Sequence, residues 1–141
     1  MKRLMIVLAL LFANGVHAQK RPILDVLYDQ VDAFNKGDIE RLVKNVSDDF
    51  IWFSLTSDTL MIDVSGKQNF RTSMINYFAG GRKVHSSIEQ YAIDGNQVSF
   101  REVVSHKGKD GQDVSASAMG IYEIVDGRIR RAWYFIDGGE A

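Results

Sequence analysis

A carboxylate near the end of the chain follows an aromatic segment that could give it acid–base chemistry. Every second position of this segment carries one of Ile129, Arg131, Trp133, Phe135 and Asp137, which places them on one face if no bulge interrupts the strand. If that face lines a pocket, burial would raise the pKa of Asp137 and allow proton transfer near neutral pH. Arg131 would oppose this by favouring a charged carboxylate in a structural ion pair. Asp137 is therefore a candidate catalytic residue, and a solvent-exposed strand end is the alternative.

Two histidines offer a second possible source of proton-transfer or metal-binding groups. His85 opens one predicted strand and His106 closes the next, so an antiparallel hairpin would bring them to the same end of a sheet. Glu102 shares a strand face with His106, but the two are separated by about 13 Å along the strand. They cannot chelate one ion alone, and the sequence has no His-Glu-x-x-His spacing. We predict no metal site and treat His85, His106 and Arg131 as polar helpers of a pocket.

Aromatic side chains alternate between the faces of the predicted strands, so they cannot all belong to one core. Some are expected to line a pocket for a small apolar or aromatic molecule. Others are expected to cover an outer sheet face that pairs two copies of the chain as a homodimer. The predicted pocket residues are Trp52, Tyr91, Met119, Trp133, Tyr134 and Phe135.

Composition excludes several classes of protein. The 141 residues include no Cys, which rules out disulfides, thiolate metal sites and a cysteine nucleophile. A formal net charge of −1 provides no basic field for nucleic acid or anionic lipid. The sequence also lacks a Gly-rich phosphate loop, a serine nucleophile elbow and a flavin fingerprint, so no cofactor is predicted.

The N-terminal segment is typical of a secretory signal peptide. Lys2 and Arg3 precede an apolar run at residues 4–13, and Val16 and Ala18 stand at the −3 and −1 positions of a cleavage site. The run is shorter than the roughly 20 residues needed to span a bilayer as a helix, and no second hydrophobic segment follows. We predict cleavage after residue 18, export to the periplasm or the medium, and no membrane span afterwards. The alternative is a buried N-terminal helix.

Helical periodicity precedes strand periodicity in what remains, residues 19–141, which we interpret as one domain. Apolar residues recur at helical spacing, and later at every second position between turns that contain glycine. Helices are predicted at about 22–36, 39–46 and 66–79, and strands at 50–55, 84–93, 97–107, 113–125 and 128–137. This order predicts an α+β fold in which one face of an antiparallel sheet covers the helices.

Several segments together resemble the nuclear-transport-factor-2-like superfamily, and within it the SnoaL-like domains, named for a polyketide cyclase. They are AFNKGDI at 33–39, DDF at 48–50 and DGRI at 126–129, with Trp133 and Asp137. The resemblance extends from about residue 22 to residue 137. It implies a cone-shaped, strongly curved antiparallel sheet wrapped around about three N-terminal helices, with a pocket inside the cone. The spacing from Gly127 to Asp137 is similar to a final-strand pattern in which an aspartate acts as acid and base.

The superfamily also includes a ketosteroid isomerase, which uses a carboxylate base together with a tyrosine and a protonated aspartic acid. Aligned on the segments above, its tyrosine falls on Gln30, its base on Ser54 and its acid on Gly120. None of the three functional groups is retained, so the sequence does not favour that activity.

Three functions remain open at this point. The favoured one is an exported pocket protein that binds a small apolar or aromatic molecule. The second is an acid–base enzyme of cyclase, isomerase or hydrolase type that uses Asp137. The third is a dimerisation or protein-interaction module whose sheet face is the functional surface.

Overall fold

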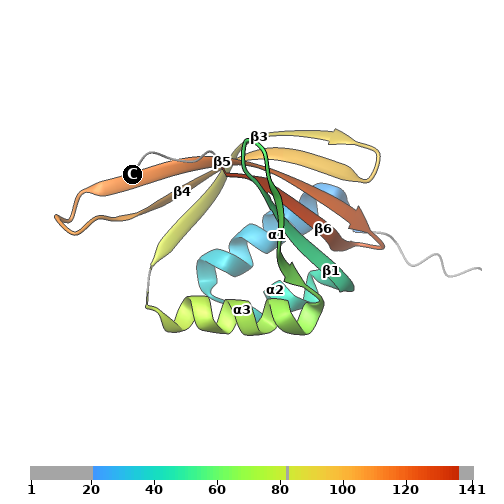
Figure 1. Ribbon diagram of the computed structural model, residues 1–141, viewed down its shortest axis with the longest axis horizontal. Helices are drawn as coiled ribbons and strands as arrows, with labels where there is room; N and C mark the ends of the chain where they lie inside the picture. Colours follow the sequence, from blue (N-terminus) through green and yellow to red (C-terminus); the bar gives the residue numbers. More distant parts are fainter. Residues whose placement is uncertain (1–20, 82, 137–141) are drawn as a thin grey trace, which may run out of the picture.

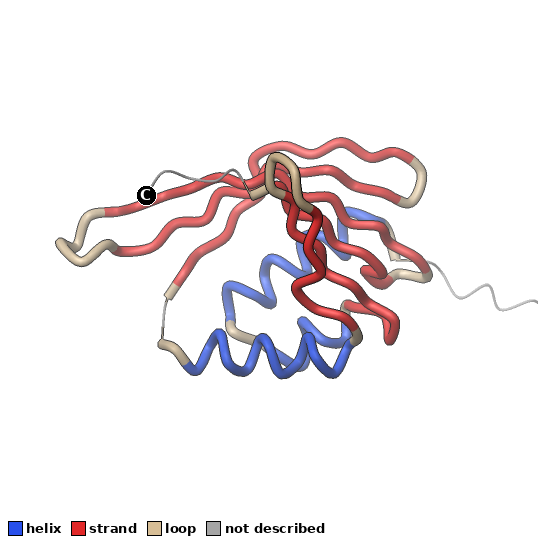
Figure 2. Tube along the Cα trace, viewed as in Figure 1, coloured by secondary structure: helices blue, strands red, loops and turns tan. Residues whose placement is uncertain are grey.

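Three helices lie on the concave side of one bent sheet in the computed structural model of the chain (Figures 1 and 2). The structure describes residues 21–81 and 83–136. The helices are α1 (Ile23–Lys36), α2 (Ile39–Lys44) and α3 (Lys67–Ala79). The strands are β1 (Val46–Leu55), β2 (Leu60–Ser65), β3 (Val84–Asp94), β4 (Gln97–Lys107), β5 (Asp113–Val125) and β6 (Arg128–Phe135). The described residues contain no helix that is long and apolar enough to cross a membrane.

The strands form a single sheet in the order β2-β1-β6-β5-β4-β3. All neighbouring strands are antiparallel except β1 and β6, which run parallel. The predicted α+β class and cone-like arrangement are confirmed. Two elements differ from the sequence prediction. Strand β2 was not predicted, and the second helix ends at Lys44 because Val46 is drawn into the sheet opposite Ile129.

The turn between α1 and α2 follows directly from local sequence. Gly37 adopts a left-handed conformation, with φ 64°, and its N–H donates to the carbonyl groups of Ala33 and Phe34. Glycine reaches this region without the steric cost that a Cβ would bring. Asp38 then caps α2, because its carboxylate accepts a hydrogen bond of 3.1 Å from the N–H of Arg41. This turn sends α2 back across α1.

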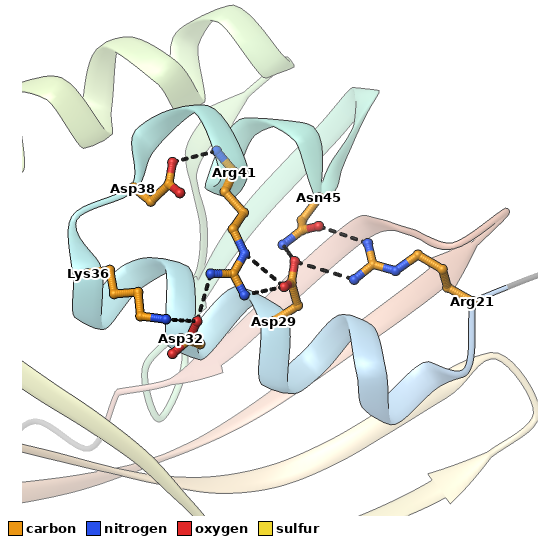
Figure 3. A network of polar contacts seen from close by, with 7 residues as sticks. All are labelled: Arg21, Asp29, Asp32, Lys36, Asp38, Arg41 and Asn45. Atoms are coloured by element: carbon orange, nitrogen blue, oxygen red, sulfur yellow. Dashed lines mark hydrogen bonds and ion pairs between the residues drawn. The ribbon is translucent and has the colours of Figure 1, made fainter.

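A polar network joins the two helices to each other (Figure 3). Arg41 donates to Asp29 from Nε at 2.8 Å and to Asp32 at 2.7 Å. The buried Asn45 donates to Asp29 at 2.7 Å and accepts from Arg21 at 2.9 Å. The carbonyl oxygen of Asn45 also accepts the N–H of Ile129 in β6 at 2.8 Å. The network therefore fixes α1 and α2 against the sheet as well as against each other.

A β-bulge in β6 decides which of its side chains face the helices. Glu123 of β5 pairs with Arg131 while the next residue, Ile124, pairs with Ile129, so Arg130 is an extra residue without a partner on β5. Ile129 and Ala132 are both buried as a result. The expectation that Arg131, Trp133 and Phe135 share a face with Ile129 required an uninterrupted strand, and the bulge removes that condition.

Removal of the central carboxylate of the helix network should weaken the fold. Burial alone would raise the pKa of Asp29, but hydrogen bonds from Arg41 and Asn45 and the charges of Arg41 and Arg21 outweigh it and lower the pKa. We expect Asp29→Asn to reduce the free energy of unfolding by about 1–3 kcal/mol at neutral pH, measured by urea denaturation.

The loss should depend on pH. A lowered pKa contributes stability above the unfolded value of 3.8, and that stability disappears as pH falls through the folded value. The gap between Asp29→Asn and wild type should therefore narrow in acid. Asp32→Asn is the matched control, with a smaller expected loss because this side chain is more exposed. Equal losses for the two variants would contradict a central role for Asp29.

Candidate functional site

A cavity of about 240 Å³ lies between the helices and the inner face of the sheet. All three helices and strands β1, β4, β5 and β6 contribute to its wall. The lining residues are mainly apolar and aromatic: Gln30, Val31, Phe34, Leu42, Phe50, Trp52, Phe70, Met74, Tyr77, Glu102, Val104, Tyr122, Ile129, Ala132 and Tyr134. A cavity of about 150 Å³ accommodates benzene, so this one has room for about 10 non-hydrogen atoms.

Aromatic rings support one another around this space. Phe50 and Phe70 meet edge to face with their centroids 5.0 Å apart, and Trp52 lies 5.6 Å from Tyr134. Phe100 packs behind Tyr122 at 4.8 Å. Rings held by such contacts give the cavity a defined shape that a flat apolar molecule could fill.

One carboxyl group, Glu102 of β4, stands in this apolar wall. The Ser86 hydroxyl of the neighbouring strand donates to it. Ser86 is itself held by Asn35 of α1, which accepts from the Ser86 N–H at 2.7 Å and donates to the Ser86 carbonyl at 2.8 Å. The side chain of Glu102 is therefore oriented by a chain of contacts that begins on α1.

Two tyrosine hydroxyls adjoin this carboxyl group. Tyr122 and Tyr134 share a hydrogen bond of 2.9 Å. Burial raises the pKa of Glu102, while hydrogen bonds from Ser86 and Tyr134 act in the opposite direction without cancelling the rise. Burial is the main reason why the pKa of both tyrosines is raised. The charge of Glu102 adds to the rise for Tyr122, and the charges of Tyr122 and Glu102 add to it for Tyr134. Both phenols therefore keep their protons at neutral pH, and the cavity favours a protonated Glu102.

Two further polar atoms at the cavity are buried without a hydrogen-bond partner in the described structure: Gln30 Oε1 and Trp52 Nε1. One is an acceptor and the other a donor. Leaving such a group unsatisfied costs about 1–3 kcal/mol. Both atoms belong to side chains that line the cavity.

The structure places only part of the predicted pocket set at the cavity. Trp52 and Tyr134 line it. Tyr91 instead packs edge to face on Tyr28 of α1, with centroids 6.5 Å apart, and is half exposed. That Trp52, Tyr134 or Tyr91 contacts a ligand stays a prediction.

Three other members of the set lie on the outer sheet face. Trp133 stacks on Phe53 with centroids 5.6 Å apart and an interplanar angle of 8°. Met119 and Phe135 pair across β5 and β6 and are both exposed. The bulge at Arg130 is the physical reason for these outward positions. It turns Ala132 and Tyr134, and not Trp133 and Phe135, toward the helices.

The predicted polar residues do not gather into one site. His85 pairs with Ser105 and His106 with Val84, so adjacent register positions direct the two histidines to opposite faces. Neither lines the cavity. Arg131 donates to the backbone oxygen of Asp49 at 2.7 Å. Asp137 lies outside the described residues.

Sequence reasoning missed Glu102, Tyr122 and Gln30 as members of one site. A signal for Glu102 was present, because it follows Val98 and Phe100 at every second position on the buried face of β4. An acidic residue in such a row calls for a partner or a function. For Gln30 and Tyr122 the sequence holds no comparable signal, since their meeting depends on how α1 lies across the sheet.

Comparison with protein families decides the classification. The sequence matches the SnoaL-like domain over residues 28–132, which covers most of the chain. The chain belongs to the SnoaL-like domain family. A comparison of this SnoaL-like chain with curated protein sequences gave no match.

Solved structures show that the SnoaL-like chain shares its fold with an NTF2-like protein from Cytophaga hutchinsonii and with other proteins of low identity. A cystatin-fold protein from Novosphingobium aromaticivorans is 20% identical, with a TM-score of 0.66 over 79% of this chain and 96% of the other. An LEH-like epoxide hydrolase from M. tuberculosis is 17% identical, with a TM-score of 0.65 over 80% of each chain. TerC, co-crystallized with polyporic acid, is 12% identical, with a TM-score of 0.65 over 82% of this chain and 92% of TerC. At these identities the likeness concerns the fold alone.

The partly buried carboxyl group of Glu102 should make the stability of the fold decrease as pH rises. Because the pKa of Glu102 is raised above its ordinary 4.5, the folded chain keeps a proton that the unfolded chain has already lost. Its stabilising contribution is complete below the unfolded pKa and is lost as pH rises through the folded pKa. Glu102→Gln cannot ionise there. Urea denaturation at about pH 4 and about pH 8 should therefore show the variant gaining stability relative to wild type as pH rises. A constant difference would contradict a raised pKa.

Proposed function

We propose that this SnoaL-like protein binds a small, largely apolar or aromatic molecule in the cavity between the helices and the sheet. The cavity itself carries the proposal, because it measures about 240 Å³ and its wall is mainly apolar and aromatic. Two side chains of this wall, Gln30 and Trp52, each hold a polar atom without a hydrogen-bond partner in the described structure. A ligand with one or two polar atoms would satisfy them, while its body filled the aromatic space. The co-crystal of TerC with polyporic acid is consistent with a ligand site in this fold.

The proposal also covers the export of the chain and the role of Asp137. We infer that residues 1–18 act as a signal peptide and that the domain of residues 19–141 works in the periplasm or the medium. Lys2, Arg3 and the apolar run that follows them support this inference, and the segment lies outside the described residues. The acid–base enzyme that uses Asp137 stays a hypothesis about a residue that also lies outside them.

A homodimer through the outer sheet face is the second candidate property. The stacked Phe53 and Trp133 lie beside the exposed pair Met119 and Phe135, and Ile62 of β2 pairs with Phe53. Together they form an apolar surface on four neighbouring strands. A second copy of the chain, presenting the same surface, would cover it with matched chemistry.

Ligand binding can be tested with two substitutions of the same kind on opposite faces of β4. Val104 lines the cavity, whereas its neighbour Val103 points away from it. Val104→Phe should fill part of the cavity and weaken binding at least about tenfold. Val103→Phe should bind as wild type does.

The probes are indole, naphthalene, p-cresol and 2-phenylethanol, each of a size that the cavity admits. Binding is measured by the fluorescence of Trp52 in a Trp133→Phe background and by ligand-observed NMR. The expected dissociation constant is about 1 mM or lower. Thermal unfolding checks that both variants fold. Equal binding by the two variants, or no binding of any probe to wild type, would refute the proposed function.

Native mass spectrometry of the protein from the exported fraction tests the signal peptide and the dimer together. The expected species is a pair of chains that each begin at residue 19. Phe135→Glu should give single chains, because it places a charge within the apolar surface. Tyr91→Glu, a similarly exposed aromatic away from that surface, is the control and should leave the pair intact. A single-chain wild type would exclude the dimer, and an uncleaved chain would exclude the signal peptide.

A further inference from the structure

The charge distribution of the cavity is one-sided. Glu102 is its one carboxyl group, and no Lys, Arg or His is found among the described residues that line it. The groups that face Glu102 from the neighbouring strands are neutral hydroxyls: Ser86 of β3, Tyr122 of β5 and Tyr134 of β6. A carboxylate in this place therefore has hydrogen-bond donors but no positive charge to balance it.

A buried carboxylate without a counter-charge is costly, so Glu102 keeps its proton when no cation is near it. A bound cation would remove that cost and favour release of the proton to solvent. Elsewhere in the chain, partly buried carboxylates do meet an internal cation, as Asp29 meets Arg41 and Arg21. Glu102 differs because the fold places a hollow, and not an arginine, in front of it.

The walls around that hollow also suit a cation. Seven aromatic rings line the cavity, and the faces of Trp and Tyr attract positive charge through their quadrupoles. Trp52 and Tyr134 stand together, with centroids 5.6 Å apart, and Tyr134 adjoins Glu102. Gln30 also lines the cavity, and its Oε1 is an acceptor without a partner in the described structure.

We propose that the ligand is a small organic amine, bound as its ammonium cation, with the nitrogen paired to Glu102 and the apolar body among the aromatic rings. This inference rests on the proposed binding function and names its ligand class. About 10 non-hydrogen atoms fit the cavity, which corresponds to one aromatic ring with a short aminoalkyl chain. An organic acid of the same size would place its carboxylate in a wall that has no Lys, Arg or His among the described lining residues, so it should bind more weakly.

Three probes of nearly equal shape separate charge from size. They are 2-phenylethylamine as the cation, 2-phenylethanol as the neutral compound and phenylacetate as the anion. At neutral pH the amine should bind wild type at least about tenfold more tightly than the alcohol, with the anion weakest. Isothermal titration calorimetry and Trp52 fluorescence in the Trp133→Phe background measure the three affinities.

Substitution of the carboxyl group tests whether Glu102 is the cause. In Glu102→Gln the ratio of amine affinity to alcohol affinity should fall at least about tenfold. The matched control is Glu89→Gln, which removes a carboxylate from an exposed ion pair with Arg101 and should leave the ratio unchanged. A ratio that persists in Glu102→Gln would overturn the inference.

The outcomes distinguish the inference from the function on which it rests. If the alcohol binds wild type as tightly as the amine, or more tightly, the amine proposal fails and the binding function stands. If none of the three compounds binds and the probes of the Val104 experiment also fail, both are overturned. Should Glu102→Gln fail to fold, the order of the three affinities in wild type still decides the inference.

Discussion

The extra residue in β6 is the constraint on which the rest of the molecule depends. Arg130 has no partner on β5, and its guanidinium binds Asp49 of β1 at 3.0 Å, while Arg131 donates to the Asp49 backbone. β1 is irregular at the same place, so both strands of the parallel pair change register together. Beyond this point Tyr134 faces the helices and Trp133 faces outward. One bulge thus sets both the polar wall of the cavity and the apolar outer surface.

Polar contacts from the helices hold the cavity open at two levels. Asp29 of α1 accepts a hydrogen bond from Arg41 of α2 and so joins the two helices. Asn35, near the end of α1, makes two hydrogen bonds with the backbone of Ser86 in β3. Ser86 in turn orients Glu102. A hollow lined by large aromatic side chains would otherwise close by movement of α1 toward the sheet, because collapse buries more apolar area. The fixed contacts resist that movement, so space for a ligand is compatible with a stable fold.

The sequence was informative wherever structure depends on neighbours along the chain. Gly37 ends α1 as expected, and the Asp126-Gly127 turn adopts positive φ at both residues to join β5 and β6. Strand β2 and the outward position of Trp133 could not be predicted, because both depend on pairing between distant segments and on where a bulge falls. The same limit applies to Glu102. Strand alternation predicts that it faces inward, but the hydroxyl groups near it come from three other strands, β3, β5 and β6.

The surroundings of Gly120 agree with the sequence-based expectation that this chain lacks the acid of ketosteroid isomerase. In the alignment on the segments that resemble the superfamily, that acid falls on Gly120, and a Cβ on Gly120 would lie 2.5 Å from the buried ring of its cross-strand partner Phe100. No side chain fits there unless the core moves. Glu102 stands two residues along β4 from Phe100, on the same face. The acidic group of this chain therefore lies on a different strand, with tyrosine hydroxyls beside it and no Lys, Arg or His among the described residues that line the cavity. Those contacts favour a protonated Glu102 that can pair with a cation once it releases the proton.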